Sequence, residues 1–229
     1  MNEYGLETPR AQEMLAAARA MGPALRMRRA QCKADFRVPD ETVSEFREAG
    51  FFKVLQPKQW GGYAMDPQVF YTLGVEIARN CPSSAWILGV IAVHNWQLAV
   101  FDDQAAQDVW AEDPSVLISS SYAPVGKVKL VDGGFRLSGR WSFSSGSEHC
   151  KWAFLGAVVP TPEAPFDMAN YRTFLVPIED YEIVHNWDVV GLQGTGSHDI
   201  VVEDAFVPEH RTHKSMDGFL CENPGNAVN

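Results

Sequence analysis

The hydrophobic pattern changes its period once along the 229-residue chain, near Pro114. Before this point apolar side chains recur at helical spacing, and after it they alternate as in strands. Such a change separates a helical part from a β-rich part, so we expect an α+β chain with more than one domain. We predict a helical domain over residues 1–113 and a β-domain, a small barrel or sandwich, over residues 114–212.

The expected helices have recognisable ends. Thr8-Pro9 begins a helix that we expect to continue to about Cys32, and Pro39-Asp40 begins a second that Gly50 closes. Asp66-Pro67 begins a third. A fourth is expected from about Pro82 to Val100, and a short fifth over residues 104–111. The expected strands are residues 116–122, 127–143, 152–159, 171–178, 181–190 and 198–208, with a hairpin turn in the Asp132-Gly133-Gly134 segment.

Composition excludes several classes of function. The formal net charge of -10 argues against nucleic-acid binding, which depends on clustered Lys and Arg. The four cysteines lie far apart and the N-terminus has no secretory pattern, so we expect reduced thiols and a cytoplasmic protein. The longest apolar stretch, residues 85–101, is interrupted by polar residues and is expected to be a buried helix, not a membrane span. The histidines have no metal-ligand spacing, so we expect no metal site.

Two serines interrupt apolar rows of the expected strands. By alternation Ser120 follows Val116 and Ile118 on one face, and Ser145 follows Trp141 and Phe143 on another. Either both strands end there and the hydroxyls meet water, or the serines line a cavity for a flat ligand. The alternation alone leaves both interpretations open.

A histidine lies on one face of the fourth expected helix. His94 shares that face with Trp86, Val90, Val93 and Gln97. A histidine in such a place is commonly a core residue with its polar atoms paired. The functional interpretation is a general base, because imidazole titrates near neutrality.

Several segments together resemble a known family. The segments "WGG", "WSFSSG" and "GLQGTGSHDIVVEDAFVP" are similar to the acyl-CoA dehydrogenase fold. "GVIAVHNWQLAVFD", "EDPSVLISSSYAP" and "GRWSFSSGSEHCKW" resemble the oxygenase components of two-component flavin-dependent aromatic monooxygenases. Within that family the nearest match is the hydroxylase of the phenolic secosteroid of bacterial cholesterol degradation, with 4-hydroxyphenylacetate 3-hydroxylase more distant. The resemblance runs from about Pro39 to Pro208.

The resemblance implies a reaction and its partners. A separate flavin reductase would supply reduced FMN, with FAD as the alternative. The oxygenase would combine reduced flavin with O2 to give a C4a-hydroperoxyflavin, which hydroxylates a phenolic or polycyclic aromatic substrate ortho to its hydroxyl, as in aromatic catabolism. It also implies a C-terminal four-helix domain that this chain lacks, with residues 213–229 as a linker toward it, and a homotetramer in the full-length form.

The resemblance also assigns roles to residues of this sequence. His94 would deprotonate or orient the phenol, Ser120 would lie near that phenol, and Ser145 would bond the flavin near N5. The flavin-binding residues implied are Trp86, Ser120, Ser121, Tyr122, Phe143, Ser144 and Ser145. Two alternatives stay open: a flavin-dependent acyl-CoA dehydrogenase with the same fold, and an inactive truncated chain.

Overall fold

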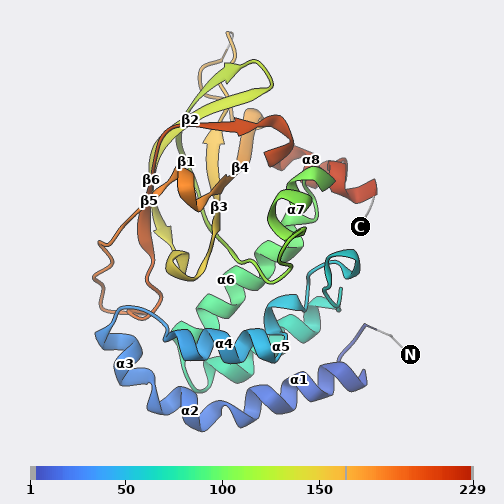
Figure 1. Cartoon of the computed structure of the whole chain (residues 1–229), viewed down its shortest axis with the longest axis vertical. Coiled ribbons are helices and arrows are strands. Elements are labelled where there is room, and N and C mark those ends of the chain that lie inside the picture. Colours follow the sequence, from blue (N-terminus) through green and yellow to red (C-terminus); the bar gives the residue numbers. More distant parts are fainter. Residues whose placement is uncertain (1–3, 163, 228–229) are drawn as a thin grey trace. The chain divides into compact units, whose positions relative to one another are not determined.

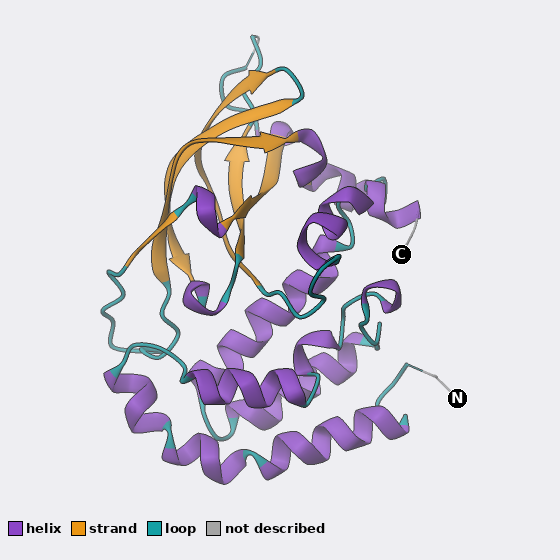
Figure 2. Ribbon diagram, viewed as in Figure 1, coloured by secondary structure: helices purple, strands orange, loops and turns teal. Residues whose placement is uncertain are grey.

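The computed structural model of the chain describes residues 4–162 and 164–227. The chain divides into two compact units (Figure 1). One consists of Met1–Trp96 with Trp187–Gly196, and the other of Gln97–Asn186 with Ser197–Asn229. Figure 1, whose colours follow the sequence, shows that the strands follow the helices of the first half, as the change of period predicts, and Figure 2 shows the same elements coloured by type.

The helical unit contains α1 (Pro9–Ala20), α2 (Gly22–Met27), α3 (Arg29–Ala34), α4 (Asp40–Glu48), α5 (Pro67–Ala78) and most of α6 (Pro82–Leu98). Several predicted ends are confirmed: Thr8 caps α1, Asp66 caps α5, and Gly50 follows α4 with a φ of 77°. The single helix expected from Thr8 to Cys32 is wrong, because the segment forms three short helices. The first break precedes Pro23, which has no N–H to donate to the preceding turn.

The β unit begins with α7 (Asp103–Trp110), close to the predicted residues 104–111. Its strands are β1 (Ile118–Val131), β2 (Gly134–Ser144), β3 (Trp152–Val158), β4 (Tyr171–Pro177), β5 (Glu182–Val184), β6 (His198–Pro208) and β7 (Thr212–Lys214). They form one series in the order β5-β6-β2-β1-β3-β4-β7. The predicted hairpin is confirmed, since Val131 pairs with Gly134 across the turn.

The long strand β1 belongs to both halves of this sheet. Its first residues pair in parallel with β3, and its last residues pair antiparallel with β2. The two halves pack on a common apolar core: the Phe135 ring on β2 lies 5.4 Å from the Phe174 ring on β4, and Trp141 Nε1 donates to the Gly156 carbonyl on β3 at 2.8 Å. The β unit is therefore a mixed sheet folded over a filled interior.

Two strand predictions need correction. The expected strand at 181–190 is a strand only over β5, and the chain beyond it contains the fully exposed Val190. Strand β1 runs through residues 123–126, where the sequence predicted an interruption. Residues 213–229, predicted as a linker, include the end of β7 and the helix α8 (Ser215–Leu220). The predicted domain boundaries themselves stay a prediction.

A search of the described residues finds no helix with the length and apolarity that crossing a membrane requires.

Candidate functional site

The first residues of β1 include three consecutive serines. Ser119 and Ser121 are buried, and Ser120 on the opposite face is half-buried. Ser121 Oγ donates to the Ser142 carbonyl at 2.6 Å, which joins the beginning of β1 to the end of β2. The "SSSY" segment therefore lies beside the "SFSSG" segment.

The end of β2 departs from simple alternation. Phe143 has a φ of 67° and is 69% exposed, and the pairing with β6 shifts between Trp141 and Ser144. The prediction that Phe143 shares the buried face of Trp141 is wrong, because this bulge turns its ring outward. Ser144 and Ser145 both follow as buried residues.

Four buried serines lie on the segment at the end of β2 and directly before β6. Ser145 Oγ lies 2.7 Å from the Oγ atom of Ser197, the residue that directly precedes β6. Ser144 Oγ and Ser147 Oγ are buried with no hydrogen-bond partner among the described residues. A buried hydroxyl without a partner costs roughly 1–3 kcal/mol, which a bound ligand with donors and acceptors can recover. We call Ser144, Ser145, Ser147 and Ser197 the serine cluster.

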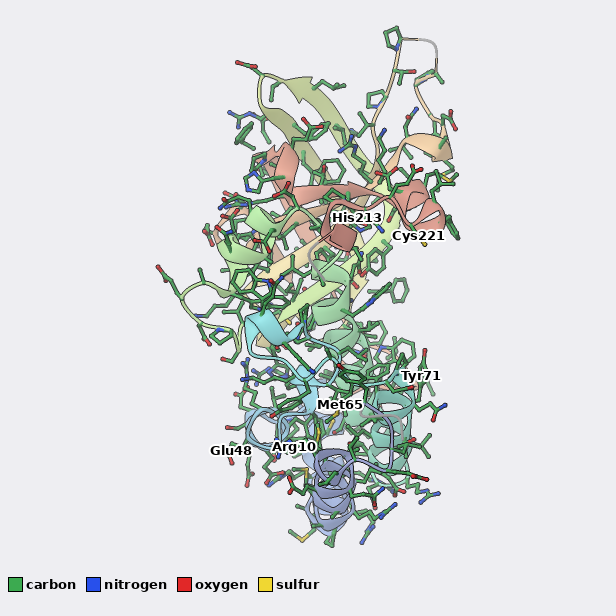
Figure 3. The ribbon with its side chains drawn as sticks, turned by 90° about the vertical axis from the view of Figure 1, so that its right-hand side faces the viewer. Arg10, Glu48, Met65, Tyr71, His213 and Cys221 are labelled. Carbon is green, nitrogen blue, oxygen red and sulfur yellow. The ribbon has the colours of Figure 1, made fainter. Side chains whose placement is uncertain are left out.

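A polar chain connects Tyr122 to a buried histidine. The Tyr122 hydroxyl donates to Gln97 Oε1, and Gln97 Nε2 lies 3.3 Å from His213 Nε2. His213 Nδ1 lies 3.3 Å from the carbonyl of Lys214, so a proton on Nδ1 leaves Nε2 to accept from Gln97 (Figure 3 labels His213). Burial lowers the pKa of His213, which favours this neutral form.

The Tyr122 phenol is held in its neutral form as well. Removal of its hydroxyl from water raises the pKa of Tyr122, although 41% of the residue is exposed. The ring thus has an open surface while its polar end is fixed, an arrangement suited to contact with a flat ligand.

Two predicted site residues belong to the helical unit. His94 on α6 is 2% exposed, and Trp86, two turns earlier on the same helix, is 49% exposed. The neighbouring Asn95 is fixed by donation from Nδ2 to the Phe52 carbonyl at 2.8 Å. His94 and Gln97 share a face of α6 by their spacing, as predicted.

The β unit therefore gathers most of the predicted site residues: Ser120, Ser121, Tyr122, Phe143, Ser144 and Ser145. Sequence reasoning did not identify Ser147, Ser197 or His213 as site residues. Ser197 directly precedes the buried strand β6, and that position was the signal available for it. Nothing in the pattern indicated His213, which reaches the site through the pairing of β7 with β4.

These residues fit a planar, hydrogen-bonding cofactor such as a flavin. Ser144 and Ser147 supply hydroxyls without a hydrogen-bond partner in the described part of the chain, and the exposed residues Phe143 and Tyr122 supply apolar contact surface. Ligand sites commonly combine an apolar lining with a few fixed polar groups.

Comparison with known proteins agrees with this fit. Residues 8–112 match the family described as acyl-CoA dehydrogenase, N-terminal domain. The oxygenase subunit HsaA of a flavin-dependent monooxygenase from Rhodococcus jostii is 49% identical over 84% of this chain and 50% of its own length. The corresponding subunit from Mycobacterium tuberculosis is 47% identical over 90% of the chain and 52% of its own length. The chain thus spans about half the length of these relatives.

Solved structures show the same relationship. The 3-HSA hydroxylase from Rhodococcus sp. RHA1 superposes with a TM-score of 0.91 at 45% identity, covering 95% of this chain and 55% of that one. XiaF from Streptomyces sp., solved in complex with FADH2 and glycerol, superposes with a TM-score of 0.83 at 27% identity over 89% of this chain and 51% of its own. Over the part that it spans, the chain is similar to the oxygenase subunits of flavin-dependent monooxygenases, and its N-terminal half matches the acyl-CoA dehydrogenase N-terminal domain.

Proposed function

We propose that the protein is the oxygenase component of a two-component flavin-dependent monooxygenase that hydroxylates a phenolic aromatic compound ortho to its hydroxyl. The observation that carries the proposal is the serine cluster. Two of its buried hydroxyls, those of Ser144 and Ser147, have no hydrogen-bond partner among the residues that the structure describes, and the exposed Phe143 directly precedes Ser144. The similarity to the oxygenase subunits named above supports it.

The cofactor in this proposal is a reduced flavin. When bound, reduced flavin supplies the electrons that activate O2. We propose that Ser144 and Ser145 hold its polar edge and that Phe143 and Tyr122 line its ring. The names of XiaF and of a resorcinol hydroxylase from Rhizobium sp., which is 36% identical, specify FADH2, so FADH2 should be tested beside FMNH2.

Ser145 has the chemistry for this role. With Ser197 as the donor in their 2.7 Å hydrogen bond, Ser145 Oγ can itself act as a donor to a flavin acceptor such as N5. The same bond fixes the rotamer of Ser145, which lowers the entropy lost on binding. We propose Ser120 as a polar contact for the phenol.

His94 is proposed as the base for the substrate. Removing the phenol proton increases electron density at the ortho carbon, which is the atom to be oxygenated. Imidazole can accept that proton near neutral pH without being permanently charged. Trp86 and Ser121 are proposed to complete the flavin-binding residues.

The whole protein would need partners. We propose a separate flavin reductase as the source of reduced flavin, a phenolic or polycyclic substrate, a cytoplasmic location and a homotetramer. The curated relatives include a p-hydroxyphenylacetate 3-hydroxylase oxygenase component from Acinetobacter baumannii at 35% identity, which is consistent with a phenolic substrate class.

Anaerobic titration with FMNH2 and FADH2 tests the flavin site. Ser145→Ala should weaken binding about tenfold, the value of one lost hydrogen bond of ~1.4 kcal/mol. Ser138→Ala removes a hydroxyl from the same strand, where it accepts from the Asp204 amide at 2.9 Å, and should leave flavin affinity unchanged. Equal affinities for the wild type and Ser145→Ala would remove Ser145 from the site.

Product analysis tests the reaction. The protein, a flavin reductase, NADH and a panel of phenols should give catechols. Formation of hydrogen peroxide alone with every phenol would contradict the proposal.

Bleaching of bound oxidised flavin by an acyl-CoA without O2 would favour the dehydrogenase alternative, whose domain family matches residues 8–112.

A further inference from the structure

Three metal-ligand side chains converge in the β unit outside the serine cluster. Glu148 lies in the 3-10 helix Ser147–His149 after β2, His185 directly follows β5, and His198 is the first residue of β6. His185 Nε2 lies 3.1 Å from Glu148 Oε1, and His198 Nε2 lies 3.6 Å from Glu148 Oε2. One ligand atom of each residue lies within 4.8 Å of the others.

The sheet topology produces this convergence. In the order β5-β6-β2, Val184 pairs with Asp199 and Ser144 pairs with His198. Continuing the β5–β6 register by one residue places His185 opposite His198, and the two rings lie 4.7 Å apart. The segment after β2 then places Glu148 beside both rings. Three residues separated by up to 50 positions therefore meet by strand register, which sequence spacing does not reveal.

The backbone that carries these residues is fastened on both sides. Asn186 Oδ1 accepts from the Asp199 N–H at 3.0 Å, which ties the residue after His185 to the residue after His198. The Asp199 carboxylate also accepts from Arg140 Nε at 2.7 Å. Held in this way, the two imidazoles need little rearrangement to bind a common ion.

The ligand set and its geometry suit a zinc-like ion. Tetrahedral bonds of about 2.0–2.1 Å separate neighbouring ligand atoms by roughly 3.3 Å, close to the two contacts observed. Two histidines with one carboxylate are a known three-residue set for Zn²⁺, with water as a fourth ligand. The side chain of His198 is 7% exposed and that of Glu148 23%, while that of His185 is 62% exposed. An ion could therefore enter from solvent and keep a bound water.

We propose that Glu148, His185 and His198 form a binding site for a divalent transition-metal ion, with Zn²⁺ as the preferred ion. The bound ion would cross-link the ends of β5, β6 and β2. Since Ser144 pairs with His198 and Ser197 precedes it, the metal would also fix the strands that carry the serine cluster. The site does not depend on the proposed oxygenase reaction.

The test is titration of chelator-treated protein with Zn²⁺ by calorimetry and with Co²⁺ by visible absorption. The background carries Cys221→Ser, because the exposed Cys221 thiol could bind zinc independently (Figure 3). We expect one Zn²⁺ per chain, and Co²⁺ bands with the intensity of four-coordinate geometry. His185→Gln and Glu148→Gln should each weaken Zn²⁺ binding at least tenfold.

The matched control is His210→Gln. His210 Nε2 also contacts a carboxylate, Asp108 Oδ2 at 2.8 Å, but that pair has no second histidine. This variant should bind Zn²⁺ as the parent does. His185 is exposed, so its substitution is expected to preserve folding, which far-UV circular dichroism checks. Absence of Zn²⁺ and Co²⁺ binding to the parent, or unchanged binding in His185→Gln, would overturn the proposal.

Discussion

At the scale of single residues, the serine cluster and His94 carry the proposed function. Ser144 and Ser147 keep hydroxyls buried without partners in the described part of the chain, although such groups lower stability. Ser145 is paired with Ser197, and His94 is almost completely buried. Costly polar groups in a fold typically mark places where function outweighs stability.

His94 can be tested by substitution with Asn. Loss of a general base is expected to lower the rate of phenol hydroxylation by about 100-fold or more, while reduced-flavin affinity changes less than twofold. Single-turnover catechol formation and anaerobic flavin titration measure the two quantities. His210→Asn serves as the control, with both values unchanged. A His94→Asn variant that hydroxylates at the wild-type rate would refute the role of His94.

A second residue-scale prediction concerns acid stability. Hydrogen bonds from Arg28, at 2.7 and 2.8 Å, hold the pKa of Glu45 below its ordinary value of 4.5. A carboxyl group whose pKa is lower in the folded than in the unfolded state stabilises the folded protein. This contribution is fully present when the pH lies above the pKa of the unfolded state, and it is lost as the pH falls through the pKa of the folded state.

Glu45→Gln should therefore destabilise the protein by about 1 kcal/mol at pH 7, where Glu45 is charged, and by less as the pH falls below 4.5. Thermal unfolding across this pH range measures the difference. Glu48→Gln, at an exposed position of the same helix, should show no such trend. A Glu45→Gln effect that is constant with pH would contradict the assignment.

At the scale of elements, the bulge at the end of β2 is the feature that sequence alternation could not show. Trp141 is buried as predicted, but Phe143 adopts positive φ and turns outward. Alternation assumes a regular pleat, and one residue in the left-handed region reverses the faces that follow. Alternation identified Ser120 and Ser145 as interruptions of apolar rows, whereas the burial of Ser144 and Ser145 needed the structure.

Phe143→Gly tests whether the bulge lowers the stability of the protein while it strengthens the binding of reduced flavin. A residue other than glycine in the left-handed region costs roughly 1 kcal/mol, and the Phe143 ring is largely exposed. The variant should therefore unfold at an equal or higher temperature, yet bind reduced flavin about tenfold more weakly because a ring contact is lost. Lower stability with unchanged flavin affinity would contradict this account.

Gly156 on β3 provides a test of the packing. A Cβ here would lie 2.3 Å from the Tyr171 hydroxyl and 2.4 Å from the Tyr122 carbonyl, which share a hydrogen bond of 2.8 Å. Gly156→Ala should destabilise the protein by about 1–3 kcal/mol. Gly74→Ala in α5 meets open space and should instead stabilise by up to about 1 kcal/mol. Urea unfolding of both variants measures these values, and a neutral Gly156→Ala would argue against the described strand packing.

At the scale of the whole molecule, features that depend on adjacent residues could be predicted from the sequence, whereas contacts between distant segments could not. Caps at Thr8 and Asp66 and the turn at Gly133 are encoded by adjacent residues, and these predictions are confirmed. The strand order, the pairing of β7 with β4 and the meeting of Glu148 with two histidines depend on contacts between distant segments. A single sequence carries no direct signal for such contacts.

The proposed reaction makes the most direct test a single turnover with isotopically labelled oxygen. Protein preloaded with reduced flavin is mixed with a phenol and ¹⁸O2, and the product is examined by mass spectrometry. The account predicts a catechol that carries one ¹⁸O atom at the carbon ortho to the original hydroxyl, with yield lowered in Ser145→Ala. Flavin oxidation with all of the oxygen recovered as hydrogen peroxide, and no labelled catechol, would contradict it.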